Sequence, residues 1–130
     1  MDIDQCACSG KSLDRFVRPA ILAALKDGKS HGYDLARTLA DLAMFRDAPP
    51  DASGVYKALK IMEKEGLLTS ALESESGGPA KRCYALTPQG RQCLRQWIDT
   101  LRGYREQVDR LLEILTAPAG TRKRKTTKGP

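Results

Sequence analysis

The fold is decided by residues 51–68, which have the sequence DASGVYKALKIMEKEGLL. Asp51 or Ser53 can cap the start of a helix here, and Gly66 is placed to end it, because glycine readily adopts the left-handed conformation found at helix C-termini. Apolar residues at helical spacing predict the buried face: Val55, Ala58, Leu59, Ile61 and Met62. Leu67 and Leu68 follow Gly66 directly, so a different apolar element is expected to begin there.

A β-hairpin is predicted after this helix. Residues 67–72 form the first strand in this interpretation, and residues 82–86 form the returning strand with Arg82, Tyr84 and Leu86 on one face. Residues 73–80 join them and contain the turn sequence Gly77-Gly78-Pro79.

A long helix is predicted from residue 88 to 116. Thr87 is a suitable N-cap, and Pro88 suits the first helical position because its missing N–H would have no helical partner there. Apolar residues then alternate at three- and four-residue spacing, which is typical of a coiled-coil seam: Leu94, Trp97, Leu101, Tyr104, Val108, Leu111 and Leu115. A lone helix with such a stripe needs a partner to cover it, so we expect these residues to form a homodimer interface.

Two helices are predicted before residue 51. The first spans residues 12–28, capped by Ser12, and Pro19 either kinks it or begins a second helix there. Ser30 caps the next helix, in which Tyr33 is the first of the apolar residues and Met44 lies near the end. Residues 46–52, with two consecutive prolines, form a loop.

The order of these elements is that of a winged helix-turn-helix, so the fold class is mainly α with a small β-hairpin wing. We expect a flexible lead at residues 1–11, a DNA-binding domain at 12–87, a dimerisation helix at 88–116 and a disordered basic tail at 117–130. In this fold the third helix enters the major groove of DNA.

The formal net charge is +6, and the tail carries most of the excess. Any basic face must therefore come from local clustering. The polar side of the third helix offers Lys57, Lys60 and Lys64, and the hairpin offers Lys81 and Arg82. These cations suit DNA phosphates. The full set of expected DNA-binding residues is Ser53, Gly54, Tyr56, Lys57, Lys60, Lys64, Lys81 and Arg82.

Three motifs resemble the PadR family of transcriptional repressors. They are His31-Gly32-Tyr33, then Ser53 to Leu59 with Glu63-Lys64-Glu65-Gly66-Leu67-Leu68, and Tyr84-Ala85-Leu86-Thr87-Pro88-Gln89-Gly90. The resemblance covers residues 19–115 and is closest to the short-tailed subfamily. It implies a homodimer that binds palindromic operators and regulates neighbouring genes. It also implies that Tyr56 and Lys57 meet operator phosphates and that Lys81 and Arg82 lie on the wing.

A small planar aromatic effector is a further expectation. Phe16, Trp97, Leu101 and Tyr104 are expected to line its pocket between the first helix and the long helices of the dimer. An alternative is a thiol- or metal-sensing repressor that uses Cys6 and Cys8, although their spacing of one residue is unlike that of common zinc sites. A third interpretation is a winged-helix protein-interaction module that does not bind DNA.

Other classes of protein are disfavoured by the sequence. We expect no enzyme, because no nucleophile constellation, phosphate-binding glycine motif or catalytic carboxylate pair is present, and we expect no cofactor. His31 is the only histidine and is expected to pack or cap a helix. No stretch is apolar enough to span a membrane, and the acidic N-terminus is unlike a signal peptide, so a cytoplasmic protein without a membrane partner is expected.

Overall fold

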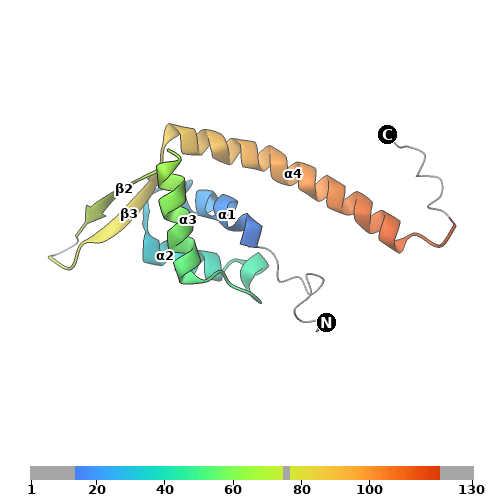
Figure 1. Ribbon diagram of the computed structural model, residues 1–130, viewed down its shortest axis with the longest axis horizontal. Coiled ribbons are helices and arrows are strands. Elements are labelled where there is room, and N and C mark those ends of the chain that lie inside the picture. The colour runs from blue at the N-terminus through green and yellow to red at the C-terminus, as the bar shows by residue number, and fades with distance from the viewer. Residues whose placement is uncertain (1–13, 75–76, 121–130) are drawn as a thin grey trace. The chain divides into compact units, whose positions relative to one another are not determined.

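The computed structural model describes residues 14–74 and 77–120 (Figure 1). The chain forms two compact units, Met1–Arg95 and Gln96–Pro130. Among the described residues, the first unit contains three complete α-helices, two 3₁₀ helices, a three-stranded sheet and the start of the last helix, and the second contains the rest of that helix. The elements in chain order are η3 (Asp14–Phe16), α1 (Val17–Leu25), β1 (Ser30–His31), α2 (Gly32–Ala40), η4 (Ala43–Phe45), α3 (Ala52–Lys64), β2 (Leu68–Glu73), β3 (Lys81–Leu86) and α4 (Pro88–Thr116).

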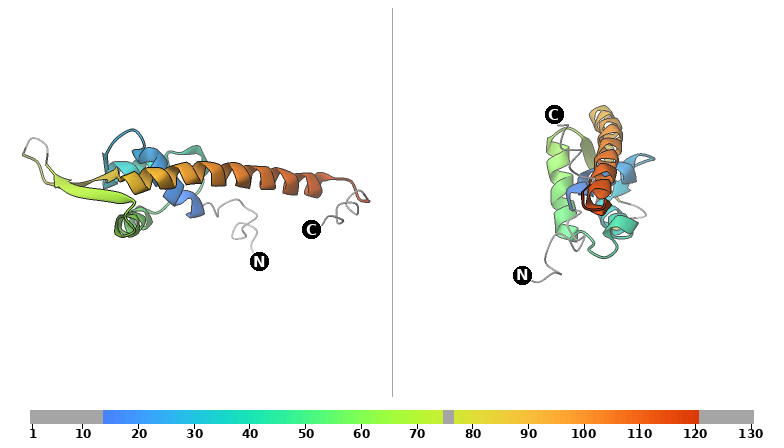
Figure 2. Two further views of the ribbon diagram at one scale, coloured as in Figure 1. Left: turned by 90° about the horizontal axis from the view of Figure 1, so that it is seen from above. Right: turned by 90° about the vertical axis from the view of Figure 1, so that its right-hand side faces the viewer.

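The sheet is antiparallel and has the strand order β1-β3-β2. The predicted hairpin is confirmed as β2 and β3, and it extends away from α1, α2 and α3 (Figures 1 and 2). Strand β1 was not predicted. Ser30, expected as a helix cap, lies in β1 opposite Tyr84, and His31 is the N-cap of α2. Two residues are too short a strand to show an alternating pattern, which explains the error.

The core lies where α1, α2 and α3 pack against one another and against β3. It is almost entirely aliphatic, as a sequence with few aromatic residues requires. The side chains with at most 2% of their surface exposed are Ile21, Leu22, Leu25, Leu35, Leu39, Phe45, Val55, Leu59, Met62 and Leu68. Each such side chain stabilises the fold by about 1.5–3 kcal/mol relative to an exposed one, so this core holds the sheet and α3 in fixed positions.

Two helix boundaries differ from the sequence prediction. The first helix is a 3₁₀ turn followed by α1, which starts at Val17, so Pro19 lies in its first turn, where a missing N–H costs no helical bond. The predicted cap Ser12 lies outside the described residues. Helix α2 ends at Ala40 instead of continuing to Met44, because Leu42 is extended and η4 then directs Phe45 into the core.

The start of α4 is fixed to the turn that follows α3. The Thr87 hydroxyl donates a hydrogen bond to the Gly66 carbonyl at 2.6 Å and accepts one from the Gly90 amide at 3.0 Å. The Thr87 amide donates to the Leu67 carbonyl at 3.1 Å. Thr87 is thus the N-cap that the sequence predicted, and it also satisfies a carbonyl just beyond the end of α3.

Replacing Gly90 with alanine is expected to destabilise this joint. An ideal Cβ on Gly90 would lie 2.1 Å from the Leu67 carbonyl oxygen, which is backbone and already bonded to Thr87. The two segments must move apart, so we expect Gly90→Ala to lower the free energy of unfolding by about 3 kcal/mol. Chemical denaturation followed by circular dichroism measures this change.

Gly103→Ala is the matched control, because Gly103 is also inside α4 and a Cβ there meets nothing within 4 Å. This variant should keep or raise stability by up to about 1 kcal/mol. Equal stability of the two variants would show that Gly90 is not in close contact with Leu67.

Within the described residues, no helix is both long and apolar enough to cross a membrane. The longest, α4, carries charged residues along its whole length.

Candidate nucleic-acid interface

The orientation of α3 is set by three buried side chains. Val55, Leu59 and Met62 have none of their surface exposed, so they anchor one side of the helix in the core. A helix turns about 100° per residue, which turns the other side outward. Lys57, Lys60 and Lys64 are all exposed there. The predicted basic row on α3 is therefore present as an accessible surface.

Ile61 does not belong to the buried face as predicted. It is 42% exposed and lies beside Lys57, Lys60 and Lys64 around a shallow hollow of about 480 Å³. The fully buried residues Val55, Leu59 and Met62 form a narrow stripe along one side of α3, and Ile61 lies outside that stripe. Its hydrocarbon side chain thus adds apolar surface to the basic row.

Ser53 and Gly54, at the N-terminal end of α3, are both exposed. Asp51 is the N-cap residue, and its carboxylate accepts a hydrogen bond of 2.8 Å from the exposed Ser53 hydroxyl. Gly54 has no neighbouring atom within 4 Å of the position of a Cβ. The first turn of α3 carries no acidic residue, and the N-cap residue Asp51 places one carboxylate beside the positive end of the helix dipole.

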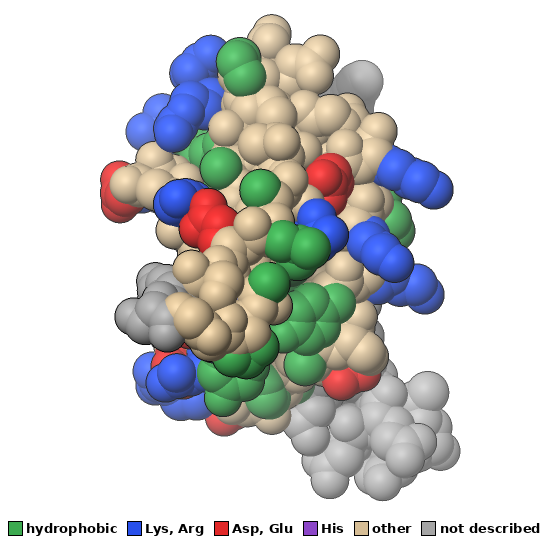
Figure 3. Space-filling view, turned by 90° about the vertical axis from the view of Figure 1, so that its left-hand side faces the viewer, with side chains coloured by type: hydrophobic (Ala, Val, Ile, Leu, Met, Phe, Trp, Pro, Cys, Tyr) green, Lys and Arg blue, Asp and Glu red, His purple; other side chains and the backbone are tan. Residues whose placement is uncertain are grey.

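Aromatic side chains lie between α3 and the start of α2. Tyr56 is 41% exposed, and its ring packs so closely on Gly32 that a Cβ there would be 2.6 Å from the ring. Tyr56 and Gly32 belong to a hollow of about 340 Å³ whose other lining residues are His31, Tyr33, Lys81, Arg82 and Tyr84. Figure 3 views this end of the molecule, with hydrophobic side chains gathered between groups of Lys and Arg.

Helix α2 contributes a residue pair that the sequence did not reveal. Tyr33, the first of the apolar residues from which this helix was predicted, is 61% exposed. Its hydroxyl makes an exposed position tolerable, and the guanidinium of Arg37 lies 5.7 Å from its ring centroid. Spacing of four residues between an aromatic and an arginine is the signal that would have indicated this pair.

The wing is tied to α3 by a chain of polar contacts. Arg82 donates a hydrogen bond of 2.9 Å to the Ser70 hydroxyl, which in turn donates to the Glu63 carboxylate at 2.8 Å. Burial is the main cause that raises the pKa of Tyr84, and the nearby Glu63 raises it further. These contacts hold the guanidinium of Arg82 beside the sheet, and both Arg82 and Lys81 are exposed.

The structure thus places the expected DNA-binding residues in one unit and on its surface. They come from α3 and β3, and each is exposed: Ser53, Gly54, Tyr56, Lys57, Lys60, Lys64, Lys81 and Arg82. Two sets of cations flank aromatic surface, an arrangement that can bind a polyanion through its phosphates and stack against flat groups. Which of these residues touch DNA stays a prediction.

The predicted dimer seam lies on α4, whose observed bounds match the predicted helix. Leu94 and Trp97 are half-buried, and the later seam residues are 37–73% exposed: Leu101, Tyr104, Val108, Leu111 and Leu115. Of the predicted effector residues, Phe16 belongs to the first unit and Trp97, Leu101 and Tyr104 to the second. The effector pocket stays a prediction.

A second group of polar side chains lies on the sheet. One potential ligand atom each from His31, Glu73 and Cys83 lies within 4.8 Å of the others. Lys29 donates a hydrogen bond of 2.9 Å to Glu73, which is the main reason why the pKa of Glu73 is lowered. Burial raises the pKa of Cys83, and the Glu73 carboxylate raises it further. Cys6 and Cys8, the thiols considered from the sequence, lie outside the described residues.

Known proteins resemble this chain in sequence and in fold. The negative transcriptional regulator PadR of Bacillus subtilis is 32% identical over 85 residues, which cover 65% of this chain and 46% of that protein. The crystal structure of B. subtilis PadR in complex with operator DNA is similar with a TM-score of 0.58 and 28% identity, over 65% of this chain and 47% of that one. A PadR family regulator from Eggerthella lenta matches with a TM-score of 0.66 and 26% identity, over 77% and 84%.

The chain spans less than half the length of the curated relatives it matches. The model of the transcriptional regulator PadR-like family matches residues 21–96, which include α2, α3, the wing and the joint at Thr87. The three motifs that resembled PadR proteins in the sequence all fall within that range. The chain therefore belongs to the PadR-like family of transcriptional regulators.

Proposed function

We propose that this protein is a DNA-binding transcriptional repressor that acts as a homodimer on a palindromic operator. Helix α3 enters the major groove, and Ser53, Gly54 and Lys57 read bases at its leading end. Lys57 also binds a phosphate, as do Lys60, Lys64 and the wing residues Lys81 and Arg82. The observation that carries the proposal is the exposed row of lysines on α3, opposite a side that is entirely buried. The structure of the B. subtilis relative with operator DNA supports it.

Selection from a random pool of duplex DNA tests this function. We expect recovery of a sequence with two inverted half-sites about 34–36 Å apart or a multiple of that distance, because a two-fold dimer presents its two recognition helices symmetrically. Failure to enrich any duplex, with the folded dimer intact, would favour the alternative of a protein-interaction module.

Response to an effector is part of the proposal. A small aromatic compound that binds near Trp97 must favour one arrangement of the two recognition helices over another, since a ligand with equal affinity for both shifts nothing. Trp97 is the only tryptophan, so its fluorescence reports on such binding.

Gly54→Ala is expected to raise the stability of the protein and to lower its affinity for DNA. A Cβ at this position meets nothing within the chain, and alanine favours a helix over glycine, so stability should rise by about 0.5–1 kcal/mol. The same methyl group would stand between α3 and a base pair edge, and we expect affinity for the selected operator to fall at least about tenfold. Thermal unfolding and fluorescence anisotropy with labelled DNA give the two readouts. Unchanged affinity would remove Gly54 from the interface.

A further inference from the structure

The register of the sheet places three potential metal ligands on one face. His31 on β1 lies directly opposite Cys83 on β3, and Ala71 on β2 lies opposite Cys83 from the other side. Residues directly opposite one another in an antiparallel sheet share a face, and so do alternate residues of one strand. Glu73, two residues after Ala71, therefore projects from the same face as His31 and Cys83. This convergence comes from three strands that are separated along the chain.

We propose that His31, Glu73 and Cys83 form a binding site for a divalent transition-metal ion, of which Zn²⁺ best fits the ligands. One imidazole nitrogen, one carboxylate oxygen and one thiolate sulfur are all zinc ligands, whereas a thiolate disfavours Mg²⁺ and Ca²⁺. Tetrahedral bonds of about 2.0–2.3 Å place ligand atoms about 3.3–3.8 Å apart. The ligand atoms lie within 4.8 Å of one another, so closing the site takes a movement of about 1 Å, within reach of side-chain rotation.

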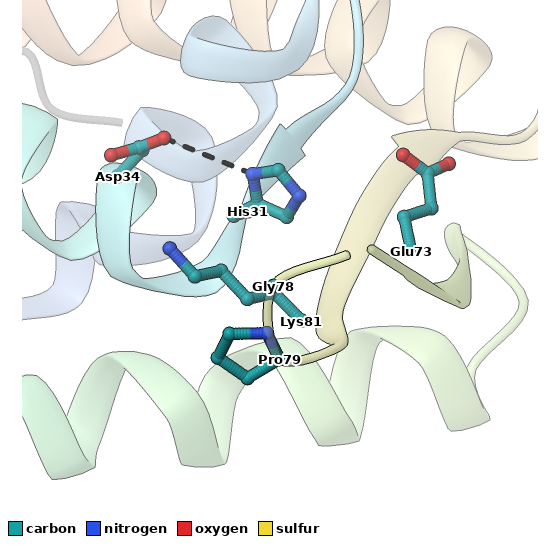
Figure 4. A pocket seen from close by; sticks show the side chains of 6 residues that line it. All are labelled: His31, Asp34, Glu73, Gly78, Pro79 and Lys81. Atoms are coloured by element: carbon teal, nitrogen blue, oxygen red, sulfur yellow. Dashed lines mark ion pairs between the residues drawn. The ribbon is translucent and has the colours of Figure 1, made fainter. Parts of the chain in front are cut away.

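A carboxylate lies near the histidine. The Nδ1 of His31 is 4.0 Å from the Asp34 carboxylate, beyond hydrogen-bond distance, and a small side-chain movement lets Nδ1–H donate to that carboxylate while Nε2 binds the metal. Figure 4 shows His31 between Asp34 on one side and Glu73 on the other. A carboxylate behind a histidine is the usual second partner at zinc sites, where it fixes the ring and strengthens its basicity.

The site also has room for a fourth ligand. His31 and Glu73 line a hollow of about 300 Å³ together with Asp34, Gly78, Pro79 and Lys81. A water molecule entering from this hollow completes a tetrahedral coordination shell around three protein ligands.

Binding of the ion displaces the Lys29 ammonium from Glu73 and the proton from the Cys83 thiol. Lys29, whose side chain is 62% exposed, leaves Glu73 for solvent, and the Cys83 thiol releases its proton to water to become the thiolate ligand. The bound ion then links β1, β3 and β2, so it joins the outer end of the wing to the residue that caps α2. Zn²⁺ should therefore raise the temperature of unfolding.

Cobalt titration of the whole chain tests the site. The chain carries Cys6→Ser and Cys8→Ser, which removes the N-terminal thiols, and is reduced and freed of metal before Co²⁺ is added. We expect a thiolate-to-cobalt charge-transfer band that saturates at one ion per chain and disappears when Zn²⁺ is added. Cys83→Ser should abolish the band, whereas Cys93→Ser, the control thiol, should leave it unchanged.

Variants on the sheet surface keep the test decisive if loss of the buried Cys83 thiol impairs folding. His31→Gln and Glu73→Gln should each weaken Co²⁺ binding at least about tenfold. Lys29→Gln breaks the same ion pair as Glu73→Gln but keeps the ligand, so its affinity should stay equal or increase. Absence of the band in the parent chain, or a band that survives both His31→Gln and Glu73→Gln, would overturn the proposal.

Discussion

Replacing Leu101 and Leu111 together with aspartate should convert the proposed homodimer to monomers. Both leucines belong to the seam on α4 and are 37% and 55% exposed in the single chain, so a partner helix can cover them. Each buried leucine contributes about 1.5–3 kcal/mol, and the double variant removes four of them per dimer. The loss is on the order of 6 kcal/mol, which corresponds to about 10⁴-fold weaker association. Four uncompensated carboxylates add to it.

Sedimentation velocity at several concentrations measures this change. The control is Gln92→Asp with Gln96→Asp, which introduces the same charges on α4 away from the seam. That control should stay dimeric, and circular dichroism should show α4 folded in both variants. A double leucine variant that sediments as a dimer would mean that the chains associate through another surface.

Neutralising the lysine row of α3 should remove most of the salt dependence of DNA binding. The variant replaces Lys57, Lys60 and Lys64 with glutamine, which removes six positive charges from the dimer. Each phosphate contact contributes about 0.9 to the slope of log affinity against log salt concentration, so the slope should fall by about 5 units. Lys60→Gln alone should lower it by about 2 units and weaken binding to all sequences alike.

The matched control removes as many charges from α4. Arg95, Arg102 and Arg110 are exposed and lie off the seam, so replacing them with glutamine changes the net charge equally. If the proposed interface is correct, this control keeps most of the slope. Equal losses in the two variants would mean that bulk charge, and not the row on α3, attracts DNA.

The helices and the hairpin could be predicted because their signals are local. The buried stripe of Val55, Leu59 and Met62, the ending at Gly66 and the cap at Thr87 each depend on a few neighbouring residues. Gly66 has a φ of +84°, as its position after the helix indicated.

The errors arose where distant segments decide the structure. Strand β1 exists because Ser30 and His31 pair with β3, more than fifty residues later, and nothing local marks it. Helix α2 ends earlier than predicted because the Phe45 side chain is buried in the core. The cluster of His31, Glu73 and Cys83 was missed for the same reason, since only the strand register brings these residues together. A lone histidine in the sequence gave no sign of it.

The joint at Thr87 also limits how this protein can be re-engineered. A designer who wishes to exchange the proposed dimerisation helix would naturally cut the chain between Thr87 and Pro88, where α4 begins. The hydrogen bonds of Thr87 to Gly66, Leu67 and Gly90, with the close contact at Gly90, show that the first turn of α4 is part of the first unit's architecture. A functional chimera should therefore keep the native residues through Arg95 and begin the foreign helix in the same helical phase after it.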